Sequence, residues 1–111
     1  MKVFQWLKDR FSRRVTAISL YKRGMVRARK HDHVGAIDDY TASIGMPETP
    51  ADLKAMVLFN RGLARVAAGD EPKGMADLNV VLAMDEAPTN VKTMARQKLA
   101  RMQTRSAKST P

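Results

Sequence analysis

The chain has 111 residues, of which 44% are hydrophobic and 28% are charged, and it contains no cysteine. This length predicts one domain with a single core, and the lack of cysteine excludes disulfide scaffolds, thiol nucleophiles and cysteine metal sites. A formal net charge of +9 raises nucleic acid, anionic membranes and acidic proteins as candidate partners.

The charge is distributed unevenly along the chain. Residues 1–31 carry ten basic side chains and one acidic, residues 32–88 carry four basic and ten acidic, and residues 89–111 carry six basic and none acidic. The protein is therefore basic at both ends and acidic in the middle, so the total charge says little about what the middle binds.

Residues 1–16 are predicted to form a basic amphipathic helix. Apolar residues follow one stripe at helical spacing: Val3, Phe4, Leu7, Phe11, Val15 and Ile18. One interpretation is a cap packed on the first repeat, which we favour because two repeats alone bury little apolar surface. The other is a helix that lies on an anionic membrane through residues 1–15. Charged residues interrupt any apolar run long enough for a signal peptide or a membrane span, which predicts a cytoplasmic protein.

An internal repeat follows this helix. Residues 20–44 align without a gap on residues 58–82, at an offset of 38 residues. Six aligned pairs are identical: Leu20/Leu58, Arg23/Arg61, Gly24/Gly62, Arg27/Arg65, Asp32/Asp70 and Asp39/Asp77. The apolar spacing predicts two helices around a short turn in each unit, with Asp32 and Asp70 as N-caps and Gly69 at a helix C-terminus. Small residues should allow close helix crossings: Gly24 with Ala36, and Gly62 with Gly74.

These features resemble the tetratricopeptide repeat family. The first copy has Gly24, the pair Ala36-Ile37, the aromatic Tyr40 and the small Ser43, and the second copy follows the pattern more loosely. The resemblance implies an all-α fold, a short solenoid of antiparallel helix pairs with about five to six helices. Sel1-like repeats are the alternative family and imply the same architecture. The sequence departs from the family in its long period and in placing arginine where a large aromatic residue is usual.

The repeats are predicted at residues 17–45 and 51–85. Residues 45–50 read as a loop, with Thr49 as N-cap and Pro50 as the first residue of a helix that runs to about residue 68. The apolar residues of that helix suit burial on two sides: Leu53, Met56, Val57, Phe59, Leu63 and Val66. Residues 89–103 are predicted to form an amphipathic capping helix, and residues 104–111 a disordered basic tail.

The sequence indicates no catalytic chemistry. His31 and His33 flank Asp32 and could hold a divalent metal loosely, but the repeat pattern assigns all three to a turn between helices. The recurrence of Asp39 and Asp77 with the repeated arginines indicates a structural ion pair in each unit. We therefore expect no enzyme activity, no cofactor and no metal.

The family resemblance implies a protein-binding adaptor or scaffold. The first helices of successive units would line a concave groove, and the groove residues would be Tyr21, Met25, Arg29, Met56, Phe59, Asn60, Leu63, Lys92 and Arg96. Members that clamp a carboxylate use Asn and Lys or Arg in such places, and only part of that set is present, because Tyr21 and Met25 stand at the other clamp positions. The expected partner is a short acidic and apolar segment or helix of another protein.

Two other partner classes remain as alternatives. Nucleic acid is disfavoured because Phe4, Phe11 and Tyr21 are predicted to be buried, which leaves Trp6 as the one aromatic platform for stacking. A homodimer is also possible, since the groove or the N-terminal helix could pair with a second copy.

Overall fold

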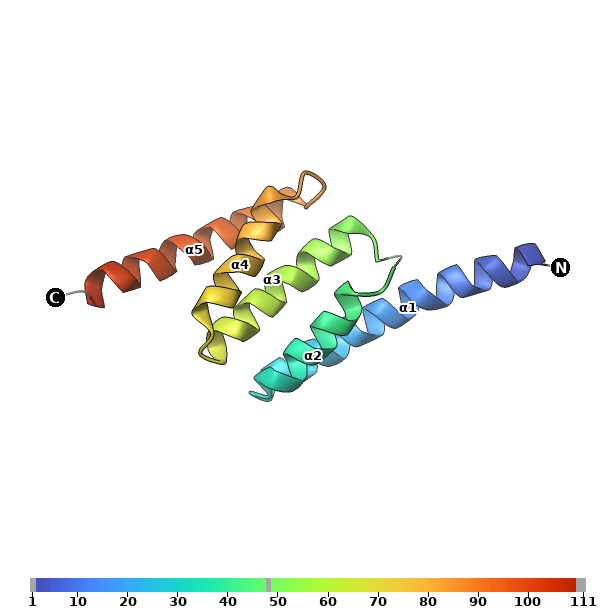
Figure 1. Ribbon diagram of the computed structural model, residues 1–111, viewed down its shortest axis with the longest axis horizontal. Helices are drawn as coiled ribbons and strands as arrows, with labels where there is room; N and C mark the ends of the chain where they lie inside the picture. Colours follow the sequence, from blue (N-terminus) through green and yellow to red (C-terminus); the bar gives the residue numbers. More distant parts are fainter. Residues whose placement is uncertain (1, 48, 110–111) are drawn as a thin grey trace.

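The computed structural model describes the backbone of residues 2–47 and 49–109; within these ranges, the side chains of residues 2, 3, 6, 7, 9–15 and 109 are outside the description. The described chain forms five α-helices (Figure 1): α1 (Lys2–Arg29), α2 (His33–Ile44), α3 (Ala51–Ala67), α4 (Glu71–Ala83) and α5 (Thr89–Ser109). The described residues contain no strand, and the prediction of an all-α fold is confirmed.

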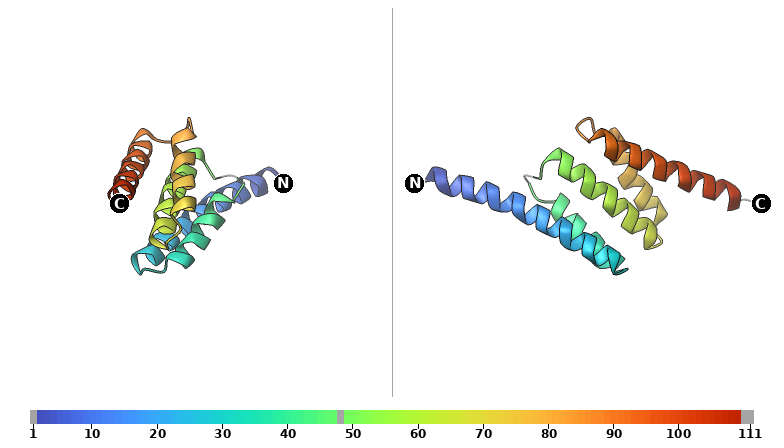
Figure 2. Two further views of the ribbon diagram at one scale, coloured as in Figure 1. Left: turned by 60° about the vertical axis from the view of Figure 1, so that its left-hand side comes forward. Right: turned by 180° about the vertical axis from the view of Figure 1, so that it is seen from behind.

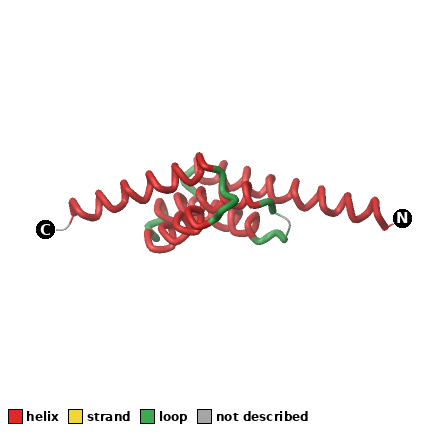
Figure 3. Tube along the Cα trace, turned by 90° about the horizontal axis from the view of Figure 1, so that it is seen from above, coloured by secondary structure: helices red, strands yellow, loops and turns green. Residues whose placement is uncertain are grey.

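The helices stack as pairs in a repeat-like arrangement. α1 packs on α2, α3 packs on α4, α2 contacts α3, and α5 covers α4 and part of α3. Seen from behind in Figure 2, α1, α3 and α5 run side by side in front of α2 and α4. We call the side formed by these three helices the α1–α3–α5 face. The molecule measures 68 × 30 × 18 Å, and its length comes from the outer parts of α1 and α5, which project beyond the helix pairs (Figure 3).

The turns inside the two units are built alike, and their predicted caps are confirmed. Asp32 accepts a hydrogen bond from the Gly35 N–H at 3.0 Å, and Asp70 accepts one from the Lys73 N–H at 3.2 Å. Gly69 follows α3 with a φ of 93°, where a glycine avoids the steric cost of a left-handed backbone. His31, which aligns with Gly69 in the repeat, takes a φ of 63°.

The core consists of two clusters that share α3. One cluster joins α3, α4 and α5 around the fully buried Leu78, Val81 and Val91. The other joins α1, α2 and α3 around Tyr40 and Val57. Because α3 contributes to both, the prediction that this helix is buried on two sides is confirmed.

Close helix crossings occur in both units, but the residues involved differ. A Cβ on Gly62 would lie 3.1 Å from the Gly74 carbonyl oxygen, so the predicted pairing of these two glycines is confirmed. A Cβ on Gly24 would lie 2.5 Å from a ring carbon of Tyr40. Gly24 therefore makes room for an aromatic ring, because the three atoms nearest to its Cβ position all belong to Tyr40. Its predicted pairing with Ala36, a fully buried residue of α2, stays a prediction.

The predicted boundary between residues 16 and 17 is not a break in the chain's secondary structure. α1 continues from Lys2 through this point to Arg29, because no proline or glycine interrupts the sequence before Gly24. The predicted burial of Phe4 is wrong, since its exposed fraction is 67%. Tyr21 is half-buried, and the side chain of Phe11 lies outside the described residues.

Two further expectations about helix ends are corrected. Thr49 does not cap α3: its hydroxyl donates to the Ser43 carbonyl at 2.9 Å, and α3 begins at Ala51 after Pro50. The predicted disordered tail is helical as far as Ser109, because α5 is already nucleated by its packed first half and meets no proline or glycine. The last two positions of that predicted tail, 110 and 111, lie outside the described residues.

Candidate functional site

The repeated arginines and aspartates form one ion cluster in each unit. Arg23 donates to both carboxylate oxygens of Asp39, from Nε at 2.9 Å and from Nη2 at 2.8 Å, and Arg27 adds a third bond at 3.1 Å. The Arg23 hydrogen bond is the main reason that the pKa of Asp39 lies below its ordinary value. The carboxylate is only 4% exposed, so this cluster fastens α1 to α2.

The second unit repeats this geometry. Arg61 donates to Asp77 at 2.9 and 2.8 Å, and Arg65 donates to both oxygens of the same carboxylate at 3.0 and 2.9 Å. The predicted structural pair in each unit is therefore confirmed. Every charge in these clusters has a partner within its own unit, so the clusters fix how the paired helices cross. Binding contacts on the α1–α3–α5 face must therefore come from other residues.

A second polar contact joins α1 to α3 on that face. The Asn60 amide donates to the Tyr21 hydroxyl at 3.0 Å and to the Met56 carbonyl at 3.0 Å. Burial raises the pKa of Tyr21, which keeps its hydroxyl protonated and able to donate onward. The Tyr21 ring also lies 6.0 Å from the Tyr40 ring, centre to centre.

A cavity of about 190 Å³ opens between α1, α2 and α3. Small apolar side chains and Leu63 form much of its wall, and polar groups come from His33, Tyr40 and Asn60. Burial raises the pKa of Tyr40 to about 12, a rise that the nearby positive charge of Arg29 opposes. The Nδ1 atom of His33 is buried and has no hydrogen-bond partner among the described residues.

The structure brings four of the predicted groove residues together. Tyr21 and Met25 pack against the α1–α2–α3 cluster, and Asn60 and Leu63 line the cavity beside them. All four are half-buried. Each of these side chains lies partly in the core and partly in solvent, so it remains accessible to a ligand.

The other five predicted residues lie elsewhere. Met56 and Phe59 are half-buried against the α3–α4–α5 cluster. Arg29 is exposed at the end of α1, whereas Lys92 and Arg96 belong to α5, which makes no contact with α1 among the described residues. The basic residues of α1 and α5 therefore flank α3 from opposite sides and do not form one cluster.

Sequence reasoning placed His33 in a turn and Tyr40 in the core, and so missed both as cavity residues. His33 is the first residue of α2, beside the capping Asp32, and its ring lies 5.9 Å from that of His31. The helical spacing that marks Tyr40 as buried cannot reveal that a cavity reaches it. The described residues contain no group of three or more metal-ligating side chains.

No family model matches the chain, and neither a curated protein nor a solved structure matches it. None of the helices in the described part of the chain is long and apolar enough to cross a membrane.

Proposed function

We propose that the protein is a non-catalytic interaction module that binds a short acidic and apolar segment of another protein on its α1–α3–α5 face. The observation that carries this proposal is the cavity on α1, α2 and α3, where His33, with a buried Nδ1 atom that has no partner among the described residues, meets an apolar wall. Such a mixture is typical of pockets that orient a ligand by a few hydrogen bonds while burying its carbon atoms.

The size and chemistry of the cavity suit one side chain of the bound segment. Its volume of about 190 Å³ accommodates a side chain with a few carbon atoms. His33 and Tyr40 line the cavity and carry groups able to form hydrogen bonds, and Arg29 supplies positive charge near Tyr40. A glutamate or aspartate side chain meets all three conditions, because its carboxylate accepts hydrogen bonds and its stem is apolar.

The rest of the segment would run from the cavity across α3 towards α5. Half-buried Met56 and Phe59 offer adaptable apolar contacts along that path. Lys92 and Arg96 on α5 would meet further acidic groups and speed association with an acidic partner.

Selection of short random peptides by display, followed by binding measurements on purified protein, tests this proposal. Ala67 is the last residue of α3, is exposed and lines the cavity, so Ala67→Trp should obstruct it without loss of core contacts. The matched control is Ala83→Trp at the exposed last residue of α4, away from the cavity.

We expect the selected peptides to be rich in Glu or Asp beside apolar residues, and Ala67→Trp to weaken their binding by about tenfold or more. Ala83→Trp should bind as the natural protein does. Failure to select any binding peptide would contradict the proposal, and so would equal binding by the two tryptophan variants.

A further inference from the structure

The first half of α1, residues 2–16, projects beyond the rest of the molecule. Ser43, near the end of α2, donates its hydroxyl hydrogen to the Ala17 carbonyl at 2.8 Å, and Ala17 is fully buried. N-terminal to this contact, α1 continues as a helix with no other described helix alongside it (Figures 1 and 3). We call residues 2–16 the projecting segment.

The projecting segment combines basic charge with apolar residues. It contains five basic residues and one acidic residue. Phe4 is 67% exposed, and Lys8 is exposed as well. Positions 3, 4, 7 and 11, all apolar in the sequence, recur at the spacing of one helix side. A basic amphipathic helix that exposes a phenylalanine is typical of an interaction surface.

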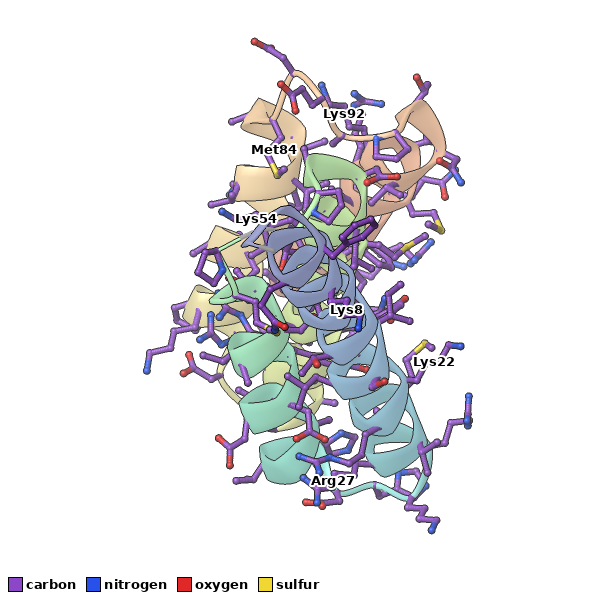
Figure 4. The ribbon with its side chains drawn as sticks, turned by 90° about the vertical axis from the view of Figure 1, so that its right-hand side faces the viewer. Lys8, Lys22, Arg27, Lys54, Met84 and Lys92 are labelled. Carbon is purple, nitrogen blue, oxygen red and sulfur yellow. The ribbon has the colours of Figure 1, made fainter. Side chains whose placement is uncertain are left out.

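The same side of α1 becomes basic where the helix joins the folded body. Lys22 follows Phe4 by 18 residues, which is five turns at 3.6 residues per turn, and Arg29 follows it by 25, close to seven turns. Both are exposed. Figure 4 shows Lys22 projecting from α1 on the side away from α2, whereas Arg27 lies on the side of α2. One side of α1 therefore presents an apolar part followed by a cationic part.

The occupant of this surface must match both properties. A second copy would bring two basic segments together, and like charges repel. Nucleic acid would satisfy the cations but leave Phe4 in water, because phosphate contacts need no apolar stripe. The surface of an anionic bilayer accepts apolar side chains below its headgroups and attracts basic residues around them.

We propose that the projecting segment lies in the plane of an anionic lipid surface, with Lys22 and Arg29 against the headgroups. The helix would hold the body at the membrane while the cavity on α1, α2 and α3 remains available to a protein segment. This inference is carried by Phe4, Lys8 and Lys22, which the proposed peptide site does not use; Arg29 is the one residue common to both proposals.

The full-length protein can be tested with vesicles of phosphatidylcholine containing one quarter phosphatidylglycerol. Trp6, the one tryptophan of the chain, reports on the projecting segment directly. We expect its fluorescence to shift to shorter wavelength with the anionic vesicles, and the protein to float with them in a density gradient at low salt. Vesicles of phosphatidylcholine alone should bind at least about tenfold more weakly.

Two matched pairs of variants distinguish binding through this surface from non-specific hydrophobic adsorption and from a general effect of charge. Phe4→Ser should weaken vesicle binding by about tenfold or more, whereas Val34→Ser, at a residue of α2 that is 69% exposed, should leave it unchanged. Lys22→Glu should weaken binding more than Lys54→Glu, whose site is an exposed position on α3. None of these sites is in the core, so thermal unfolding should be alike in all variants.

Absence of binding to the anionic vesicles overturns the proposal, as does equal binding by Phe4→Ser and Val34→Ser. Without vesicle binding, retention of polyuridylate RNA assigns the surface to nucleic acid. Sedimentation that shows a dimer dissociated by Phe4→Ser, again without vesicle binding, assigns it to a second copy.

Discussion

The two repeat units contain the same ion cluster in different surroundings. In the first unit the side chains of Arg23 and Arg27 are 58% and 38% exposed, whereas in the second those of Arg61 and Arg65 are 15% and 21% exposed. The second unit has helices packed on both sides, α2 on one and α5 on the other, while the first has a neighbour on one side. The repeat thus determines which groups pair, and the neighbours determine how far water reaches them.

A hydrogen bond between the units adds to this difference. Arg61 donates from Nη1 to the Thr41 hydroxyl at 3.2 Å, which connects the cluster of the second unit to α2 of the first. The second unit is therefore expected to be the more stable part of the protein, and substitutions at equivalent positions should have unequal effects.

The largest difference is expected at the two buried aspartates. Asp77→Asn should lower the free energy of unfolding by about 2–3 kcal/mol, because it leaves two poorly hydrated arginines without their shared anion. Asp39→Asn should cost less, since Arg23 and Arg27 can turn to water. Urea unfolding followed by circular dichroism measures both, and an equal loss in the two variants would contradict the comparison.

Low pH should lower the stability of the first unit because it protonates Asp39. Its pKa is below the ordinary value of 3.8 in the folded state, chiefly because Arg23 hydrogen-bonds to the charged form. A depressed pKa contributes stability above the unfolded-state pKa, and this contribution is lost as the pH falls through the folded-state pKa. Stability should therefore fall as the pH drops below about 4, and fall less steeply in Asp39→Asn. Urea unfolding midpoints of the natural protein and of Asp39→Asn, measured at successive acid pH values, check this. If the two midpoints fall in parallel as the pH drops, the prediction is contradicted.

Substitutions in the two turns should have smaller effects on stability, and these effects should have opposite signs in the two units. Gly69→Ala should destabilise the protein by about 1 kcal/mol, because alanine is strained at positive φ. His31→Gly should stabilise it by up to about 1 kcal/mol, since it relieves that strain in the first unit. Thermal unfolding midpoints show both changes. A loss of stability in His31→Gly would mean that the imidazole makes a contact worth more than the strain.

The smallest effect is expected at the link between the units. Thr41→Val removes the hydroxyl that accepts from Arg61 and keeps the shape of the side chain. It should cost about 0.5 kcal/mol, because this hydrogen bond is exposed to water. A double-mutant cycle with Asp77→Asn measures the coupling, and additive losses would show that the link does not support the second cluster.

Local sequence patterns predicted much of this fold. The caps Asp32 and Asp70 act on backbone within their own turn, so a few neighbouring residues suffice to identify them. The ion clusters were predictable for another reason: Arg and Asp recur together at one offset, and two occurrences at one spacing indicate a shared contact.

Features that depend on distant parts of the chain were not predictable. Whether Phe4 is buried depends on where α2 ends, and the helical periodicity around Phe4 does not indicate this end. Thr49 has a good capping side chain, but its hydroxyl donates to the Ser43 carbonyl of the preceding helix. The cavity at His33 and Tyr40 arises from the relative placement of three helices, so no spacing rule reveals it.

Hydrogen exchange of the intact protein, resolved by residue, tests the unequal support of the two units most directly. The slowest amides should lie in α3 and α4, followed by α2, and the fastest helical amides should lie in residues 2–16 of α1, where no other described helix packs. Equal protection of α2 and α4, or slower exchange in the first half of α1 than in α3, would contradict this account.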